Sequence, residues 1–511
     1  MTDDLSRRDL LGSSAAAAVA AVFPSLAPLD TAVAQSVPSS AAEIVAAIRE
    51  KKITATAVTK AALERAEHVK GLNAFIFLNK DGALAAAAEI DERRSGPFAG
   101  PLAGLPVVIK DNINTVDMPT SGGTPALQNA HPSRNAPSID KLFKAGAIII
   151  GKTNLHELAF GITSTNLSSF AGPVKNPYDK TRIPGGSSGG TAAAIAAGIV
   201  TCGLGTDTGG STRIPGALTG TVGLRPSVGN GGPDRRYNDE NMVVPISHTR
   251  DTIGPMGRTV ADVALLDSVI TRSELAVAAP LRGKRFGAPP ILWGGLDRDV
   301  ENAMKAAREK LESAGAVFVE ADIAGLFEQN AKVSFPLALH EPIEDFAAYL
   351  KASHLPDITL ADIAAKIASP DVKGAFGAIT ADAFGAKYPD ALTVQRPALQ
   401  KMYADYFRDN NVDAILFPTT IAPAPLIDAV NGSGEMSING GPPVPVFDTM
   451  IRNTDPGSNA GIPGLSLFAG MTPGGLPVGL EIDGPVGSDP KLLALGLSIE
   501  AILGNAPPPK L

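Results

Sequence analysis

Two serine-containing segments of this 511-residue chain are rich in glycine and could support acyl-transfer chemistry. Ser187 lies in Pro184-Gly-Gly-Ser-Ser-Gly-Gly190, and Ser211 lies in Gly209-Gly-Ser-Thr-Arg-Ile-Pro215. Glycine at this density permits backbone conformations in which several N–H groups converge beside a hydroxyl. A tetrahedral oxyanion needs such converging N–H groups as it forms. Either segment alone is also compatible with a glycine-rich turn that happens to contain serine.

A lysine follows a short apolar run upstream of both serines. Lys110 ends the segment Gly104-Leu-Pro-Val-Val-Ile-Lys. Such a lysine could mark a strand end and extend its charged group into water along its aliphatic stem. If its amine were buried instead, desolvation would lower the pKa and leave a neutral base. Lys110 taken alone leaves both interpretations open.

Taken together, the three segments resemble the signature of the amidase signature family. That family combines a lysine at a strand end, a GGSSGG segment and, 24 residues later, the serine of a GGS-x-R-x-P segment. Ser187 and Ser211 are 24 positions apart, and both segments fit the pattern. The resemblance extends from about Ser40 to Ile502. Further similarity is found in Gly151-Lys-Thr-Asn154, Asn176-Pro177 and Gly254-Pro-Met-Gly-Arg-Thr-Val-Ala-Asp262.

The resemblance implies a role for each of the three side chains. Ser211 would be the nucleophile, and Ser187 would be a bridging serine preceded by a cis peptide bond. Lys110 would accept the nucleophile's proton through Ser187 and later return it to the leaving amine. The reaction would proceed through an acyl-enzyme that water hydrolyses, and it requires no histidine, metal ion or cofactor.

The same resemblance gives supporting roles to the residues around the nucleophile. Asp207 and Arg213 would hold the loop by an ion pair, and Ser188 would form a supporting hydrogen bond. The oxyanion hole would consist of the backbone N–H groups of Thr208, Gly209, Gly210 and Ser211.

The elements that must position these residues alternate between strand and helix. Short apolar runs predict strands at 107–109, 147–150 and 413–417, with helices between them, such as 191–197. This alternation indicates an α/β fold. The resemblance implies the amidase signature fold, a mixed twisted β-sheet covered by helices on both faces. One catalytic domain would span 35–511, with a helical insertion at 336–410 that could form a cap.

The first 34 residues are predicted to be an export signal. Ser6-Arg-Arg-Asp-Leu-Leu11 places twin arginines ahead of an apolar stretch, and the small-residue site Ala32-Val-Ala34 follows. This pattern resembles a twin-arginine signal peptide and predicts a periplasmic or secreted protein. Pro24 and Pro28 interrupt the apolar stretch, which is short for a membrane span, so no stable membrane anchor is expected.

Composition narrows the possible partners. The formal net charge is −8 and lysine and arginine never form a run longer than two, which argues against a nucleic-acid partner. Cys202 is the only cysteine, so an intrachain disulfide and a multi-cysteine metal site are excluded. The expected partner is a small-molecule amide, and a homodimer is left open.

A second interpretation of the Ser187 segment is the G-x-S-x-G elbow of the α/β-hydrolases, which Gly185-Gly-Ser-Ser-Gly189 fits. Ser187 would then attack the substrate, and a downstream histidine such as His248 or His340 would be the base. This interpretation leaves the Ser211 segment unexplained. It also lacks the strand that should directly precede the elbow.

The substrate is indicated by resemblance alone. Segments 112–115, 155–163 and 244–251 are most similar to those of bacterial indoleacetamide and mandelamide hydrolases, which implies a primary amide of an arylacetic-type acid. An aryl anilide, another secondary amide or an ester is the alternative. The loop 229–241 is longer and more polar than this resemblance leads us to expect. The acyl pocket is predicted to involve Ala159, Phe160, Gly161 and Ile162.

Overall fold

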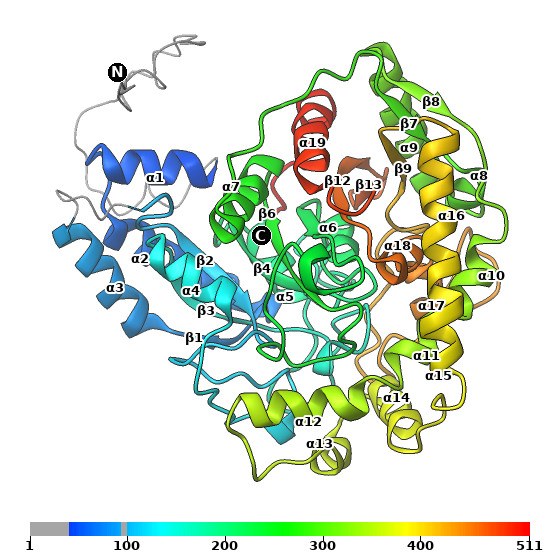
Figure 1. Cartoon of the computed structure of the whole chain (residues 1–511). Coiled ribbons are helices and arrows are strands. Elements are labelled where there is room, and N and C mark those ends of the chain that lie inside the picture. The colour runs from blue at the N-terminus through cyan, green and yellow to red at the C-terminus, as the bar shows by residue number, and fades with distance from the viewer. Residues whose placement is uncertain (1–39, 94–99) are drawn as a thin grey trace, which may run out of the picture. The chain divides into compact units, whose positions relative to one another are not determined.

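Eleven strands form one mixed sheet in the computed structural model, which describes residues 40–93 and 100–511 (Figure 1). Two further short strands, β10 and β11, pair separately at Glu435–Met436 and Val444–Pro445. From one edge of the large sheet to the other, the strands are β1 (Phe75–Leu78), β3 (Ile148–Thr153), β2 (Pro106–Lys110), β4 (Cys202–Asp207), β6 (Thr252–Gly257), β5 (Val222–Arg225), β12 (Gly464–Met471), β13 (Pro477–Asp483), β9 (Ala414–Pro418), β7 (Arg285–Gly287) and β8 (Val317–Val319).

The sheet contains both parallel and antiparallel pairs. β2 is parallel to β3 and β4, whereas β6 is antiparallel to β4 and β5. Every residue of β2, β3, β4, β5 and β6 is buried. Burial of both side-chain directions is typical of strands with helices on both faces. The α/β fold and the mixed sheet that the sequence predicts are therefore confirmed.

Helices flank this sheet. In the first half of the described chain they are α1 (Ala41–Arg49), α2 (Ala55–His68), α3 (Lys80–Arg93), α4 (Pro137–Lys144), α5 (Gly189–Ala196), α6 (Arg213–Thr219) and α7 (Val260–Thr271). In the second half they are α8 (Pro290–Trp293), α9 (Arg298–Ser313), α10 (Leu326–Ala331), α11 (Ser334–Ala338), α12 (Pro342–Ala352), α13 (Leu360–Lys366), α14 (Pro370–Thr380), α15 (Tyr388–Asp390), α16 (Arg396–Asp409), α17 (Val446–Ile451), α18 (Asp455–Ala460) and α19 (Asp489–Leu503). None of the helices within residues 40–93 and 100–511 combines the length and hydropathy needed to cross a membrane.

Two groups of buried apolar side chains attach the helices to the sheet. One joins α1, α2, α4 and α5 to strands β2, β3 and β4, and its centre includes Ile109. The other joins α9 and α19 to β12 and β13, with Leu311 and Leu492 at the contact. Burial of each such side chain contributes about 1.5–3 kcal/mol. The site therefore lies on strands that are packed from both sides.

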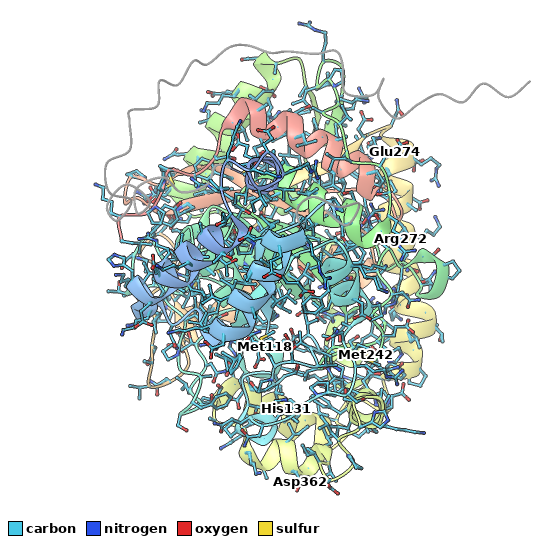
Figure 2. The ribbon with its side chains drawn as sticks, turned by 90° about the vertical axis from the view of Figure 1, so that its left-hand side faces the viewer. Met118, His131, Met242, Arg272, Glu274 and Asp362 are labelled. Atoms are coloured by element: carbon cyan, nitrogen blue, oxygen red, sulfur yellow. The ribbon has the colours of Figure 1, made fainter. Side chains whose placement is uncertain are left out.

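Helices α11 to α16 make up the helical insertion, residues 334–409. Figure 1 shows α12 and α13 at the lower edge of the view, and Figure 2 places Asp362 of α13 far below Arg272, which follows α7. The inner side chains of this region, such as Phe346 and Phe376, share a core cluster with Leu158 and Val244. All described residues, this region included, form one compact unit. The export signal predicted at 1–34 lies outside the described residues.

The predicted catalytic residues lie at the ends of adjacent elements. Lys110 is the last residue of β2 and Asp207 is the last residue of β4. These strands are parallel neighbours, so their carboxyl ends meet at one edge of the sheet. Ser187 and Ser211 lie two residues before the starts of α5 and α6. The strand predicted at 107–109 extends to Lys110 because Lys110 pairs with Thr153 on β3.

Candidate active site

Lys110 and Ser187 meet at the edge of the sheet where β2 and β4 end. Lys110 Nζ lies 2.7 Å from Ser187 Oγ and 2.7 Å from Thr206 Oγ1. Asn112 Nδ2 donates to the same threonine hydroxyl at 3.0 Å. Lys110 and Ser187 are both fully buried. The peptide bond between Gly186 and Ser187 is cis.

Burial changes the protonation of this lysine. Desolvation lowers the pKa of Lys110 from 10.5 to about 7, although the negative charges of Asp207 and Asp251 oppose the shift. A substantial fraction of the amine is therefore neutral at pH 7, and a neutral amine can accept a proton. The interpretation in which Lys110 extends into water is wrong, because the side chain has no exposure.

Ser188 joins the two serine segments. Its N–H donates to the Ser211 carbonyl oxygen at 3.1 Å. Its hydroxyl donates to the Thr206 carbonyl oxygen at 3.1 Å and accepts from the Thr206 N–H at 3.2 Å. The Ser211 backbone is thereby tied to the residue that follows Ser187. Ser211 retains 5% exposure whereas Ser187 has none, so Ser211 is the more accessible of the two serines.

The backbone N–H groups of residues 208–211 differ in what they bind. The Gly210 N–H donates to Asp207 Oδ1 at 3.0 Å. Within the described residues, no acceptor is bonded to the N–H groups of Thr208, Gly209 or Ser211. An oxyanion needs uncommitted donors, so we expect the N–H groups of Thr208, Gly209 and Ser211 to be its main donors. The Gly210 N–H stabilises the loop itself, and its place in the oxyanion hole stays a prediction.

Fully buried ion pairs anchor this loop from the sheet side. Arg213 donates to Asp207 through Nε at 3.1 Å and through Nη2 at 3.0 Å, and Arg225 Nη1 donates to Asp207 Oδ1 at 3.2 Å. Arg213 also bonds to Glu481 on β13. Burial by itself would raise the pKa of Asp207, but the two arginines hold it well below its usual range. We call Asp207, Arg213, Arg225 and Glu481 the rear network.

A second set of contacts holds the loop from the side of the helical insertion. Thr208 Oγ1 donates to Asp251 Oδ1 at 2.6 Å, and Arg250 donates to the Thr208 carbonyl oxygen through Nε and Nη2, each at 3.3 Å. Two residues earlier in the chain, His248 Nδ1 lies 2.9 Å from Asp345 Oδ1 on α12. We call His248, Arg250, Asp251 and Asp345 the front network.

The segment predicted to line the acyl pocket lies against the Ser187 segment. A Cβ placed on Gly186 would come 2.8 Å from the Ile162 carbonyl carbon. Ile162 is buried and Phe160 is half-buried. The Phe160 ring packs edge-to-face on Phe376 of α14, with 5.1 Å between centroids. The predicted pocket segment is therefore beside the site, but part of its aromatic surface is already covered by the helical insertion.

Ala159 and Gly161 shape the turn that carries Phe160. Ala159 is buried and has a φ of +63°, a left-handed conformation that is uncommon for a residue with a Cβ. Gly161 packs against the His156 ring so closely that a Cβ there would overlap it. Both residues therefore determine the course of the backbone beside the site.

Neither histidine of the α/β-hydrolase interpretation contacts Ser187. His248 is bonded to Asp345, and His340 Nδ1 lies 2.7 Å from Asp382 Oδ1. Among the residues that the structure describes, Lys110 is the one side chain bonded to Ser187 Oγ. The geometry therefore favours the lysine over a histidine as the base.

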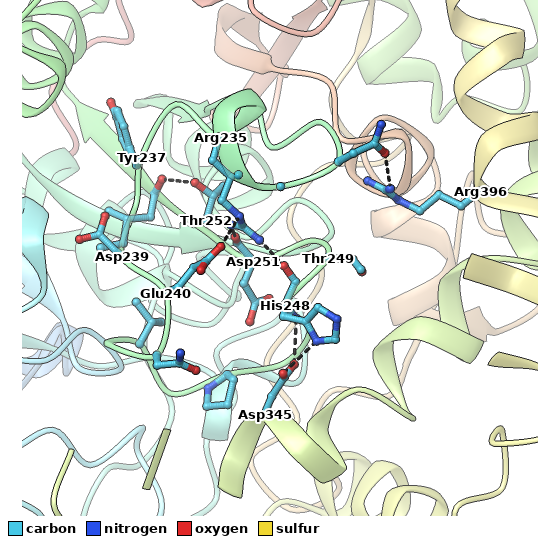
Figure 3. A pocket seen from close by; sticks show the side chains of 17 residues that line it. Arg235, Tyr237, Asp239, Glu240, His248, Thr249, Asp251, Thr252, Asp345 and Arg396 are labelled. Carbon is cyan, nitrogen blue, oxygen red and sulfur yellow. Dashed lines mark hydrogen bonds and ion pairs between the residues drawn. The ribbon is translucent and has the colours of Figure 1, made fainter. Parts of the chain in front are cut away.

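A cavity of about 330 Å³ lies beside the front network (Figure 3). Its wall consists largely of the loop 230–241 and the start of β6, with Arg396 contributed by α16. None of the three predicted catalytic residues lines it. Arg235 on this wall donates to the Asp251 carbonyl oxygen at 2.6 Å, and Arg396 donates to the Asn459 carbonyl oxygen at 2.9 Å. The arginines of this cavity are thus committed to the protein's own carbonyl groups.

One group of described residues has ligand atoms close enough to hold a cation. These atoms of His248, Glu341 and Asp345 lie within 4.8 Å of one another. Glu341 accepts from Thr249 Oγ1 at 3.0 Å and from the Tyr388 hydroxyl at 3.2 Å. The hydrogen bond to Asp345 raises the pKa of His248 to about 9, although burial opposes this. A protonated imidazole therefore supplies the positive charge that this group requires.

The residues that contact the site or the loop and were missed by sequence reasoning include Thr206, Arg225, Arg250 and Asp251. Thr206 carried a usable signal, because it precedes Asp207 on a strand and side chains alternate between the two faces there. The other three lie on different segments from the loop. Their contacts depend on the pairing of β4 with β6 and of β6 with β5.

The chain belongs to the amidase family, whose model matches residues 57–493. It is therefore an amidase. It is 41% identical to an indoleacetamide hydrolase of Agrobacterium vitis over 466 residues, which cover 90% of this chain and 96% of that protein. It is 39% identical to a mandelamide hydrolase of Pseudomonas putida over 487 residues, covering 91% and 92%. A peptide amidase from Stenotrophomonas maltophilia has the same fold, with a TM-score of 0.76 at 30% identity over 93% of this chain and 99% of that one.

Proposed function

We propose that this enzyme hydrolyses carboxylic acid amides through an acyl-enzyme on Ser211, with Ser187 as the bridging serine and Lys110 as the base. One observation carries the proposal. Lys110 Nζ is fully buried, lies 2.7 Å from Ser187 Oγ and has its pKa lowered to about 7. A buried neutral amine that contacts a hydroxyl is the arrangement that activates a serine without histidine.

The proton moves along this chain of groups in both directions. Ser211 Oγ attacks the amide carbonyl carbon and passes its proton to Ser187 Oγ, while the Ser187 proton passes to Lys110 Nζ. The C–N bond then breaks, and the proton returns from Lys110 through Ser187 to the leaving nitrogen. Water repeats the sequence on the ester and releases the acid.

The developing oxyanion would be stabilised by the free N–H groups of Thr208, Gly209 and Ser211. The loop that carries them is held by the rear network on one side and by Asp251 and Arg250 on the other. Donors that are fixed before the reaction need no reorganisation during it. Each such donor typically contributes about 10²–10³ in kcat.

For the substrate we propose a primary amide of an arylacetic-type acid. The support is the names of the two relatives that are about 40% identical over nearly the whole chain, an indoleacetamide hydrolase and a mandelamide hydrolase. A secondary amide, an anilide or an ester is the second candidate.

Ammonia release from phenylacetamide tests the mechanism. Ser211→Ala and Lys110→Met should each lower kcat/KM by about 10⁴-fold, because residues that act as one unit lose activity together. Ser268→Ala on α7, whose hydroxyl bonds only locally to the Leu265 carbonyl oxygen, is the matched serine control and should retain full activity. If His248→Ala abolished turnover while Lys110→Met did not, the assignment of the base would be overturned.

We also propose that the chain is exported through the twin-arginine pathway. The support is the pattern Ser6-Arg-Arg-Asp-Leu-Leu11 followed by an apolar stretch and Ala32-Val-Ala34. Amidase activity should therefore appear in the periplasmic fraction of expressing bacteria. Replacing both Arg7 and Arg8 by lysine should retain it in the cytoplasm, and unchanged fractionation would contradict export by this route.

A further inference from the structure

Three phenylalanines from distant parts of the chain stack on one another. The Phe335 ring of α11 lies 6.4 Å from the Phe384 ring at an interplanar angle of 29°, and 6.3 Å from the Phe447 ring at 25°. Phe335 is 44% exposed and Phe447 is 39% exposed. Aromatic rings are usually placed where they bury most of their area. A stack that leaves two rings this exposed has apolar area that a ligand could cover.

Phe447 connects this stack to the Ser211 loop through α17. Ile451 lies one helical turn after Phe447, so the two side chains share a face of the helix. A Cβ placed on Gly209 would come 2.8 Å from Ile451 Cδ1. Ile451 is nevertheless only partly buried. An apolar surface thus runs from the stack to the loop that carries the free N–H groups.

Phe335 is connected to the same loop through Arg250. It follows Ser334, whose carbonyl oxygen accepts from Arg250 Nη1 at 3.0 Å. Arg250 in turn donates to the Thr208 carbonyl oxygen. Phe335 is thus connected to Thr208 through Ser334 and Arg250, and Phe447 is connected to Gly209 through Ile451. The two phenylalanines are more than one hundred residues apart in sequence.

We infer that the Phe335–Phe384–Phe447 stack, continued by Ile451, is the surface that binds the aryl ring of the substrate. This inference rests on the proposed function and adds the residues that select the substrate. Parallel rings at about 6 Å leave faces and edges on which a further ring can stack in the offset geometry that aromatic pairs prefer. Phe160 is half-buried and packs against Phe376 at 5.1 Å, whereas Phe335 and Phe447 keep 44% and 39% exposure.

The test compares an aryl with an aliphatic substrate in the full-length enzyme. Phe335→Ala and Phe447→Ala should each lower kcat/KM for phenylacetamide about tenfold, mainly through KM, and leave kcat/KM for propionamide within threefold. Phe335→Tyr keeps the ring and should restore the preference. Phe143→Ala on α4, a phenylalanine with 38% exposure, is the matched control and should change neither substrate.

Several outcomes would overturn the inference. Equal losses for both amides would show that the stack only supports the fold, and no loss for either would show that the ring binds elsewhere. If the phenylalanine variants changed the mass measured by sedimentation but not the ratio of kcat/KM for phenylacetamide to that for propionamide, the stack would instead be a contact between copies of the chain. Binding of phenylacetate to Ser211→Ala, with and without Phe335→Ala, gives a readout that remains informative if the wild-type enzyme hydrolyses no amide.

Discussion

The rear and front networks hold the same loop, residues 208–211, by different means. In the rear network, the side chains of Asp207, Arg213, Arg225 and Glu481 have no exposure at all. In the front network, the side chain of His248 is 44% exposed and its partner Asp345 is 11% exposed. Both networks bond to the loop: Asp207 of the rear network accepts from the Gly210 N–H, and Asp251 of the front network accepts from the Thr208 hydroxyl.

This difference in exposure indicates how a catalytic loop can be held rigidly while the charges beside it can still change. Charges without water must be completely paired, because an unpaired buried charge costs several kcal/mol. The two arginines hold the pKa of Asp207 low, so we expect Asp207 to stay ionised across the working pH range, whereas burial raises the pKa of Glu481. The front network is partly solvated, so its ion pairs are weaker and can titrate. We expect the rear network to determine whether the loop forms and the front network to adjust its electrostatics.

The largest effect should come from breaking the rear network. Arg213→Met removes the cation that pairs with Glu481 and leaves Asp207 with Arg225 alone, all in a fully buried site. The free energy of unfolding should fall by about 3–5 kcal/mol. Urea or thermal denaturation followed by circular dichroism measures this loss. Arg182→Met, which removes a half-exposed pair with Asp179, is the control and should cost less than about 1 kcal/mol.

The second effect is the pH dependence of the wild-type enzyme. Lys110 must be neutral to accept a proton, and its pKa is lowered to about 7. kcat/KM should therefore rise about tenfold per pH unit below pH 7 and level off above it. A plot of kcat/KM against pH between 5 and 9 measures this rise, which we call the acidic limb. A limb near the ordinary lysine value of 10.5 would contradict the role of burial.

The third effect is a shift of the acidic limb that depends on which network is changed. Asp207 and Asp251 both raise the pKa of Lys110, but only Asp251 belongs to the partly solvated side. Asp251→Asn removes a negative charge, so the pKa of Lys110 should fall and the acidic limb should move to lower pH. Asp345→Asn changes the same network, but the carboxylates that act on the pKa of Lys110 are Asp207 and Asp251, so this variant should leave the limb in place. Equal shifts in both variants would contradict the assignment of the effect to Asp251.

The smallest effect concerns the stability of the front network. The folded pKa of His248 is about 9, above its unfolded value of 6.5, so its stabilising contribution is complete below pH 6.5 and is lost as pH rises through 9. Burial also raises the pKa of Asp345, and the cost of ionising that carboxyl offsets part of the gain. Allowing for solvent screening, His248→Gln should cost about 1 kcal/mol at pH 6 and almost nothing at pH 10. Denaturation at both pH values measures this difference, and an equal cost would contradict it.

Much of the site could be predicted because its chemistry is local in the chain. Ser187 and Ser211 each lie in a short glycine segment beside the helix that they precede, and their spacing reflects one helix and one strand between them. Lys110 was recognisable as the end of an apolar strand. The hydrogen bond from the Gly210 N–H to Asp207 could not be predicted, because it depends on side-chain geometry that spacing does not reveal.

The sequence by itself determined the α/β alternation, the two serines, the lysine and the family to which the chain belongs. Only the tertiary structure decided that Lys110 is buried and so has a lowered pKa, because desolvation depends on what packs around the amine. It alone also brought Arg225 to Asp207, Glu481 to Arg213 and Phe335 to Phe447. These contacts join segments far apart in the chain through strand order and helix packing, which no local pattern of residues records.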